Sequence, residues 1–549
     1  MLAAVRGSER RGFAAAVLPR AARAFVRGVF AAVLAAPLAG AQAPEFDVLI
    51  KGGTVIDGSG AARFPADVAL KGDRIALISR QPLAAARAAR VIDASGKIVA
   101  PGFIDMHAHL DPLPQLPAAE SAVRQGVTFA LGGPDGSSPV PLGEYMAARE
   151  KQTIGINVGY LIGHNSVRRE VVGMANRAPT PDELNRMKAL VAEAMSDGAF
   201  GMSTGLRYQP GNFSKIDEVI ALSRVAADSG GIYTSHLREE GLGLIAGVAE
   251  AITIGRDAMI PVVLTHHKAV GQKMWGQSAR TLAMIDSARG LGIDVMADVY
   301  PYTATSTGIS VLIPNWAFGG GDTAFARRIE DPVLRDSIRN GIIFNILNDR
   351  GGGDIARVQF SNVRWQPDLN GKTLADWAKQ RGIAPTPENG ADLVIEAELK
   401  GGASMIYHVL DENDVQRIMK HPRVMIGSDG RLARFGDASS PHPRAYGTFP
   451  RVLGRYARDM KLFPLETAIH KMSGLPAARL GVTDRGTLRA GQFADVVVFD
   501  PATVADKSTF EQPHQYSTGI EYVFVNGVVT VDNGRFIDAR AGRVLRRPK

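Results

Sequence analysis

Histidine and aspartate residues follow several apolar segments that lie far apart in the sequence. The residues of these segments that could bind a metal ion are His107 and His109 in PGFIDMHAHL, His236 in YTSHLREEG, His266 or His267 in VVLTHHK, and Asp429 in VMIGSDG. If PGFIDMHAHL is a strand, His107 and His109 point the same way, because alternate strand residues share a face. Imidazole and carboxylate are the ligands expected at a catalytic zinc site. The set predicts a metal centre if the carboxyl ends of these segments meet.

The composition limits what such a site can contain. Cys is absent from the 549 residues, which excludes disulfides, thiolate ligands and a Cys nucleophile. Apolar residues make up 45% and charged residues 21%, which is typical of a globular protein and excludes a disordered chain. The net charge of +8 is concentrated near the two ends of the chain. A nucleic-acid partner would need basic residues on a folded face, so we do not expect one.

Residues 1–43 have the order of an export signal. Arg-rich residues 1–27 precede the apolar run GVFAAVLAAPLAG at 28–40, and Ala41-Gln42-Ala43 follows as a cleavage site. The run is too short to span a bilayer, and it contains Pro37. We expect cleavage after Ala43 and a periplasmic or secreted protein without a stable membrane anchor. The alternatives are a poorly ordered basic tail and a misassigned start codon.

The middle of the chain alternates short apolar strands with amphipathic helices, which is typical of a parallel α/β domain. The expected strands are 103–109, 127–131, 157–163, 200–204, 232–236, 262–266, 294–299 and 424–428. Among the expected helices are 181–197, with Thr180 as N-cap, and 217–229. Eight strands with intervening helices predict a (β/α)₈ barrel, whose active site lies at the carboxyl ends of the strands. The connection at about 301–421 is long enough to be an inserted subdomain.

Both ends of the mature chain have short β-type runs separated by Gly and Asp turns. We therefore expect a small β domain built from residues 44–100 and 485–549, with the barrel at 101–484 between them.

The chain resembles the amidohydrolase superfamily and, more closely, its D-aminoacylase (N-acyl-D-amino-acid deacylase) branch, from about residue 47 to about 533. The resemblance rests on PGFIDMHAHL, GAFGMSTGLRYQPGNF, YTSHLREEG, THHKAVG, ADVYPYTAT, VMIGSDG and HPRAYGTFPRVL. It implies a metal-dependent deacylating hydrolase on a distorted TIM barrel with a small β-sandwich domain.

The resemblance also assigns residues. His107, His109, His236, His266 and Asp429 match ligand positions of the family, and Asp429 also matches the general base. The family pattern favours His266 over the adjacent histidine, for which we expect a packing role. The fourth strand segment, AFGMSTG, contains no Lys, so a carbamylated lysine that bridges two ions has no donor there.

One position departs from the family pattern. The D-aminoacylase branch has a Cys ligand just after the second strand, whereas this chain has FALGGPDGSS with Asp135 in that place. A carboxylate can bind zinc and can bridge two ions, and as a harder ligand it tolerates Mn²⁺ or Co²⁺. We therefore expect Asp135 to be a ligand. The alternative is that Asp135 only forms a Pro-Asp-Gly turn.

The substrate implied by the resemblance is an N-acyl-D-amino acid, whose carboxylate needs a cation. Arg444 is the main candidate, because a guanidinium binds a carboxylate bidentately. Lys268 and Tyr300 are further candidates for substrate contact, and a solvated or packing role is the alternative for all three. We expect Asp429 to take a proton from water activated by one or two Zn²⁺ ions.

The sequence thus predicts an exported metal-dependent hydrolase of N-acyl-D-amino acids. A hydrolase of dipeptides or cyclic amides, and a non-catalytic exported binding protein, are the alternatives. The oligomeric state is left open by the sequence.

Overall fold

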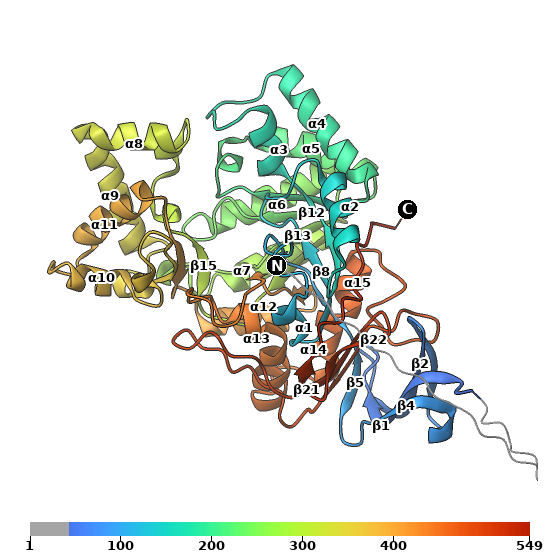
Figure 1. Cartoon of the computed structure of the whole chain (residues 1–549). Coiled ribbons are helices and arrows are strands. Elements are labelled where there is room, and N and C mark those ends of the chain that lie inside the picture. The colour runs from blue at the N-terminus through green and yellow to red at the C-terminus, as the bar shows by residue number, and fades with distance from the viewer. Residues whose placement is uncertain (1–42, 549) are drawn as a thin grey trace, which may run out of the picture. The chain divides into compact units, whose positions relative to one another are not determined.

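The computed structural model describes residues 43–548 (Figure 1). All but the last residue of the predicted export signal lies outside this range. In the described part of the chain, no helix has both the length and the apolar character needed to cross a bilayer.

Parallel strands form the wall of a distorted (β/α)₈ barrel. In order around the wall they are β6 (Phe103–Asp105), β8 (Val127–Gly132), β9 (Asn157–Tyr160) with β10 (Ile162–Gly163), β11 (Gly201–Gly205), β12 (Ile232–His236), β13 (Val262–Leu264), β14 (Val295–Val299) and β18 (Val424–Ile426). Beyond β18, β19 (Gly430–Arg431) pairs in parallel with β7 (Ala108–His109), which joins the last strand to the first. The predicted (β/α)₈ fold is therefore confirmed, although two of the predicted strands are each broken into two.

The barrel strands are buried on both faces, which explains their nearly continuous apolar sequences. Phe129, Phe200 and Met296 point into the barrel and belong to one buried cluster. The barrel interior is thus filled by side chains, and open space begins only at the carboxyl ends of the strands.

Helices cover the outside of the barrel in succession. Those between the barrel strands, apart from the helices of the insertion, are α1 (Glu120–Val123), α2 (Leu142–Gln152), α3 (His164–Val171), α4 (Pro181–Ser196), α5 (Ile216–Asp228), α6 (Leu244–Ala258), α7 (Ser278–Gly290) and α12 (Glu412–Lys420). Helix α4 begins with a capping box, in which the Thr180 hydroxyl accepts from the Glu183 N–H and the Glu183 carboxylate accepts from the Thr180 N–H. The predicted helices 181–197 and 217–229 match α4 and α5 to within one residue.

An insertion between β14 and α12 forms a lobe with its own apolar core (yellow in Figure 1). It contains α8 (Asp322–Glu330), α9 (Pro332–Asn348), α10 (Leu374–Gln380) and α11 (Pro387–Leu399), with an antiparallel sheet of order β15 (Thr305–Gly308), β17 (Ser404–Tyr407), β16 (Val358–Asn362). Helix α12 packs on α7 and β18 and so belongs to the barrel. The insertion therefore ends before Glu412, not at residue 421 as the sequence suggested.

The small β domain is one nine-stranded sheet to which both ends of the described chain contribute. Its strands are β1 (Phe46–Val55), β2 (Phe64–Lys71), β3 (Arg74–Ser79), β4 (Ala88–Asp93), β5 (Ile98–Pro101), β20 (Val496–Phe499), β21 (Ile520–Val525), β22 (Val528–Asp532) and β23 (Arg535–Phe536). The sheet branches at β1, whose first half pairs with β4 and whose last two residues pair with β5. Antiparallel pairing of β5 with β20 joins the two halves, and their apolar side chains share one core.

Residues after β23 leave this sheet and run along the barrel. The N–H of Leu545 donates to the carbonyl of Val158 in β9 (2.7 Å), and the N–H of Arg547 donates to the carbonyl of Gly198 (2.9 Å). The Leu545 side chain packs against the cluster inside the barrel. The basic residues near the end of the chain thus flank a segment that is bound to the barrel.

The three α-helices that follow the last barrel strand are α13 (Arg444–Arg451), α14 (Leu465–Met472) and α15 (Gly474–Arg479).

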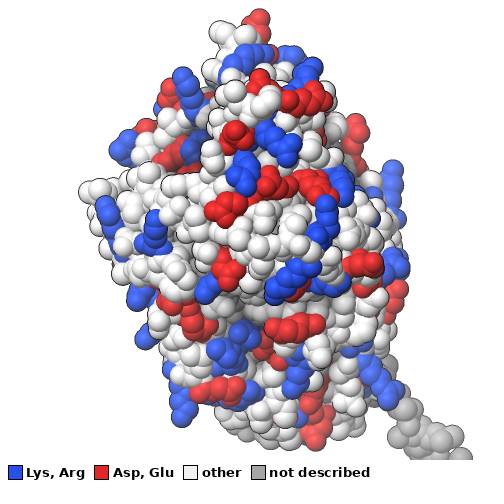
Figure 2. Space-filling model, turned by 90° about the vertical axis from the view of Figure 1, so that its left-hand side faces the viewer, with Lys and Arg blue, Asp and Glu red and all other residues white. Residues whose placement is uncertain are grey.

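On the face that Figure 2 shows, basic and acidic side chains are interspersed, so this face offers no continuous basic stripe for a nucleic acid.

Candidate metal centre

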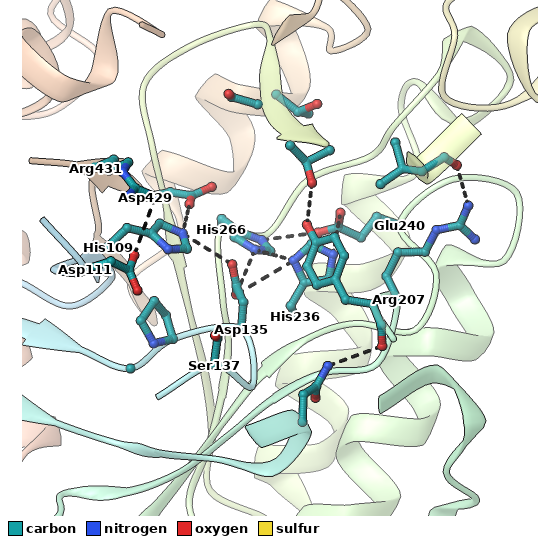
Figure 3. Close-up of a pocket in the computed structure, with 18 of the residues that line it drawn as sticks. His109, Asp111, Asp135, Ser137, Arg207, His236, Glu240, His266, Asp429 and Arg431 are labelled. Carbon is teal, nitrogen blue, oxygen red and sulfur yellow. Dashed lines mark hydrogen bonds and ion pairs between the residues drawn. The ribbon is translucent and has the colours of Figure 1, made fainter. Parts of the chain in front are cut away.

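The predicted metal ligands lie together at the carboxyl-terminal rim of the barrel, in two groups that share one residue. The first group is His107, His109, Asp135 and Asp429, and the second is Asp135, His236 and His266. Figure 3 shows Asp135 between the two groups. The rim is the place where a barrel of this type carries its catalytic residues.

In the first group, two imidazoles face two carboxylates. Nε2 of His109 lies 3.0 Å from Oδ1 of Asp429 and 3.5 Å from Oδ2 of Asp135. Nε2 of His107 lies 3.5 Å and 3.4 Å from the same two oxygens. Four donor atoms from three separate parts of the chain therefore surround one point.

In the second group, two imidazole nitrogens face each other and the other oxygen of Asp135. Nδ1 of His236 lies 2.7 Å from Nε2 of His266, and these nitrogens lie 3.7 Å and 3.3 Å from Oδ1 of Asp135. Asp135 thus presents one carboxylate oxygen to each group, which is the geometry of a bridging ligand.

The donor set fits metal ions. Both ring nitrogens of His107 and Oδ1 of Asp135 are buried without a hydrogen-bond partner in the described chain. Buried polar atoms are normally paired, and an ion bound at each group would pair Nε2 of His107 and Oδ1 of Asp135. Imidazole and carboxylate are ligands of Zn²⁺ and of other divalent first-row metals.

The electrostatics of the centre also favour cations. Burial lowers the pKa of His109, but Asp135 and Asp429 outweigh burial and raise it to about 10. Burial and Lys268 lower the pKa of His266, yet Asp135 and other acidic groups raise it to about 10. The carboxylates thus hold positive charge at both groups, and without a metal ion protons supply it.

Three of the predicted ligands have left-handed backbone conformations. The φ angles are 53° at Asp135, 38° at His266 and 50° at Asp429. Such angles are uncommon outside Gly and cluster at functional sites, where they cost roughly 1–3 kcal/mol each. Gly205 makes room for the first of these turns, because a Cβ there would lie 2.1 Å from the carbonyl oxygen of Asp135.

Glu240, which the sequence analysis did not single out, lies behind the second group. Its Oε1 accepts from Nζ of Lys268 (2.6 Å) and lies 3.2 Å from Nδ1 of His266, while its Oε2 lies 3.5 Å from Nε2 of His236. Carboxylates in this position orient ligand histidines. The four-residue spacing from His236 in SHLREE was the available signal.

Asp105 and Asp298 are two further buried acids that the sequence analysis missed. Oδ1 of Asp105 accepts from the N–H groups of His107 (3.1 Å) and Ser428 (2.8 Å), which ties β6 to the loop before Asp429. Burial raises the pKa of Asp105 to about 6, although bonds from Ser428 oppose the shift. Asp298 accepts from the His266 N–H (2.7 Å) and fixes that ligand's backbone.

Tyr300 lies close to both of the other predicted substrate contacts. The ring centroid of Tyr300 lies 4.9 Å from the Arg444 guanidinium carbon and 5.6 Å from Nζ of Lys268. The hydroxyl of Tyr300 is buried without a partner in the described chain. Nη1 of Arg444 lies 2.7 Å from Oδ2 of Asp429, and Lys268 is bonded to Glu240. The predicted packing role fits His267, whose Nε2 lies 2.7 Å from the Thr281 hydroxyl.

A cavity of about 570 Å³ opens above the metal groups. His109, Asp135 and His236 lie at its base, and Lys268 and Tyr300 are in its wall. This volume lies within the range of small-molecule sites, roughly 300–1,000 Å³. The arrangement fits a hydrolytic site, with the predicted metal ligands at the base of an open pocket.

Comparison with known proteins agrees with this geometry. The model of the Amidohydrolase family matches residues 90–270 and 353–531. D-aminoacylase of Alcaligenes xylosoxydans xylosoxydans is 39% identical over 526 residues, covering 91% of this chain and 98% of that protein. The chain belongs to the amidohydrolase family. N-acyl-D-glutamate deacylase of the same organism is also 39% identical, over 92% of this amidohydrolase and 97% of the relative, which places the chain in the D-aminoacylase branch.

Solved structures of amidohydrolases support the same fold. The crystal structure of D-aminoacylase superimposes with a TM-score of 0.78 at 37% identity, covering 91% of this chain and 100% of that one. N-acyl-D-glutamate deacylase from Bordetella bronchiseptica, in complex with zinc and a phosphonate inhibitor, gives 0.77 at 37% identity. The resemblance stated from the motifs is thereby confirmed, and this amidohydrolase is a metal-dependent hydrolase of amide bonds.

Proposed function

We propose that this amidohydrolase hydrolyses N-acyl-D-amino acids to a carboxylate and a free D-amino acid. The observation that carries the proposal is the bridging position of Asp135 between two histidine groups, directly below a pocket whose wall contains Lys268 and Tyr300. The relatives that act on N-acyl-D-amino acids are similar over nearly their whole length, which supports the same substrate class.

Asp429 is the proposed general base. Burial raises its pKa, but Arg444 and His107 outweigh burial and hold the pKa well below the usual range of a carboxyl group. The group is therefore ionised at neutral pH and can accept a proton from water and return it to the leaving amine. Bound divalent ions would polarise the substrate carbonyl and make that water more acidic.

The carboxylate of the substrate would bind between Arg444, Tyr300 and Lys268. Arg444 supplies charge, and the buried hydroxyl of Tyr300 supplies a hydrogen bond that it does not make in the described chain. Because Arg444 also contacts Asp429, binding of the carboxylate there brings the scissile amide beside the general base.

We propose zinc as the metal, with one ion at each group, and Mn²⁺ or Co²⁺ as functional substitutes. Zinc in the complex of the Bordetella bronchiseptica relative supports the identity, and the two carboxylate oxygens of Asp135 support the number. We also propose that the protein is exported to the periplasm or secreted, on the strength of the signal pattern in residues 1–43.

The test is hydrolysis by zinc-loaded protein of matched N-acetyl-D- and N-acetyl-L-amino acids. We expect turnover of the D-series, and a fall of about 10²–10⁴-fold in kcat for Asp429→Asn, the usual contribution of a general base. An Asp286→Asn variant, at a surface acid whose carboxylate pairs with His421, is the control. Equal rates for the wild type and Asp429→Asn would exclude Asp429 as the general base, and no turnover by either protein would favour a binding protein.

A further inference from the structure

Strand β15 of the insertion has a free edge. It pairs with β17 on one side, and no other strand of the described chain pairs with its other side. All four of its residues are partly exposed, whereas the barrel strands beside the metal groups are fully buried. Free edges present backbone groups that can pair with another extended chain.

The hydrogen-bond pattern shows which backbone groups face outward. The N–H of Ile309 donates to the carbonyl of Ala403 (2.9 Å), and the register places Gly308 opposite Ser404. Hydrogen-bonded and non-hydrogen-bonded pairs alternate in an antiparallel ladder, so the groups of Ser306 and Gly308 point away from β17.

Of these outward groups, the two carbonyls already have partners. The carbonyl of Ser306 accepts from Nη2 of Arg444 (3.3 Å), and that of Gly308 accepts from the Tyr407 hydroxyl (3.0 Å). The N–H groups of Ser306 and Gly308 have no partner outside the ladder among the described residues. They are two unused donors about two residues, roughly 7 Å, apart.

This edge faces the reaction centre. Arg444, which holds the Ser306 carbonyl, is the residue whose Nη1 lies 2.7 Å from Oδ2 of Asp429. Ser306 and Gly308 line a second cavity of about 800 Å³, which Asp429 and Arg444 also line. Ser306 and Thr307 line both cavities, as do His109 and Asp429, so the two cavities meet at the reaction centre.

The second cavity has polar walls. Its polar lining includes Asn362, Arg364, Lys400 and Ser404, and its larger apolar side chains are Ile309, Trp365 and Leu432. Such walls do not suit a long aliphatic chain, which gains only from burial against apolar groups. They suit a chain that carries its own hydrogen-bonding groups.

We propose that the free edge of β15 binds the acyl portion of the substrate, and that this portion is an extended peptide. The inference rests on the proposed hydrolysis of N-acyl-D-amino acids and names the acyl group. Alternate carbonyls of an extended peptide point the same way and recur every two residues, which matches the spacing of the two N–H donors. An acetyl group offers only the scissile carbonyl, so it cannot use them. The substrate class is therefore a peptide that ends in a D-residue.

Gly308 allows the donor to be removed with little other change. Its φ of −70° and ψ of 155° are those of proline, and the preceding residue is in a strand, as proline requires. An added Cβ would meet only the Ser310 hydroxyl, at 3.3 Å. Gly308→Pro removes the N–H that points away from β17, and Gly308→Ala adds a Cβ but keeps this N–H. Comparing the two variants therefore separates the effect of losing the Gly308 N–H from the effect of adding side-chain atoms.

The experiment compares three substrates of one D-amino acid, with acetyl, acetyl-glycyl-glycyl and heptanoyl as acyl groups. For the peptidyl substrate, we expect Gly308→Pro to lower kcat/KM by roughly 2- to 10-fold, the effect of one hydrogen bond. The acetyl and heptanoyl substrates should change less than twofold, and Gly308→Ala should match the wild type on all three. Thermal melting of both variants checks that they fold.

Two results would overturn the proposal. One is equal loss on all three substrates by Gly308→Pro, and the other is a wild-type preference for heptanoyl over the peptidyl group. If the wild type hydrolyses no substrate, the proposed function fails, and calorimetric titration with the peptide then tests the subsite alone. Binding that Gly308→Pro weakens and Gly308→Ala retains would support the edge, and equal binding by both would refute it.

Discussion

Replacing Asp135 with Asn tests the bridge between the two metal groups. The carboxylate presents Oδ2 to His107 and His109 at 3.4 and 3.5 Å, and Oδ1 to His266 and His236 at 3.3 and 3.7 Å. An amide of the same shape has one oxygen, so it can serve one group and must turn its NH₂ toward the other. The second group then keeps as few as two donors, and the negative charge shared by both groups is lost.

We expect Asp135→Asn to bind about one ion fewer per chain than the wild type. Loss of a group that merely orients a ligand costs about 10–100-fold in metal affinity, so loss of a ligand should cost at least as much. The measurement is metal content by mass spectrometry after dialysis against a fixed free zinc concentration, together with kcat/KM. Asp111→Asn is the matched control, because Asp111 lines the same cavity but belongs to neither group.

The opposite result has a clear meaning. If Asp135→Asn keeps the metal content and kcat/KM of the wild type, Asp135 is only the Pro-Asp-Gly turn that its neighbours allow, and the bridging geometry has no function. Asp135→Cys adds a second measurement, since it supplies the thiolate of the family pattern. It should restore metal content above that of the Asn variant.

Three further results are expected. Glu240→Gln should weaken metal binding about 10–100-fold, because the Glu240 carboxylate orients the predicted ligands His236 and His266. Competition with a chelator measures the affinity, and an unchanged affinity would contradict this role of Glu240. The pKa values of about 10 at His109 and His266 lie above the value of 6.5 in the unfolded chain. Protonation of these residues therefore stabilises the folded, metal-free protein, fully below about pH 6.5, and this stabilisation is lost as the pH rises through 10. Metal must displace these protons, so its affinity should rise with pH over that interval, and calorimetry that shows no proton release would refute this. Arg444→Lys should raise KM for N-acyl-D-amino acids more than for their uncharged amides, because Lys cannot bind a carboxylate bidentately; equal effects on both would exclude carboxylate recognition by Arg444.

The barrel could be predicted because its strands are buried on both faces. Complete burial produces short apolar runs, and the turn that ends each run carries the polar residue of the rim. Local sequence was sufficient for the helices as well, as the capping box at Thr180 shows.

The backbone conformation at the ligands could not be predicted in the same way. The sequence treated His266 as the last residue of a strand, whereas β13 ends at Leu264 and His266 has a φ of 38°. Period-two alternation gives no sign of such a turn. The turn depends on Asp298, a residue of the next strand that accepts from the His266 N–H.

Residues that act through others were also missed. Glu240 and Asp105 touch ligand residues from behind, and their position depends on strand register, which a single sequence specifies only weakly. For the same reason the pairing of Arg444 with Asp429 was not foreseen, although both residues were selected. Residue types were sufficient to predict metal binding and hydrolysis, whereas tertiary contacts determine which side chains pair with one another at the site.

The pairing of β5 with β20 has a consequence for how the protein folds. These strands are neighbours in the sheet but are separated by almost 400 residues of sequence. Contacts of such high sequence separation form late and slow the search for the native state. During synthesis, β1 to β5 emerge long before their partners, and their apolar faces stay uncovered until β20 arrives. Chaperone protection of this first segment would therefore be expected to raise the yield of folded protein more than protection of the barrel helices.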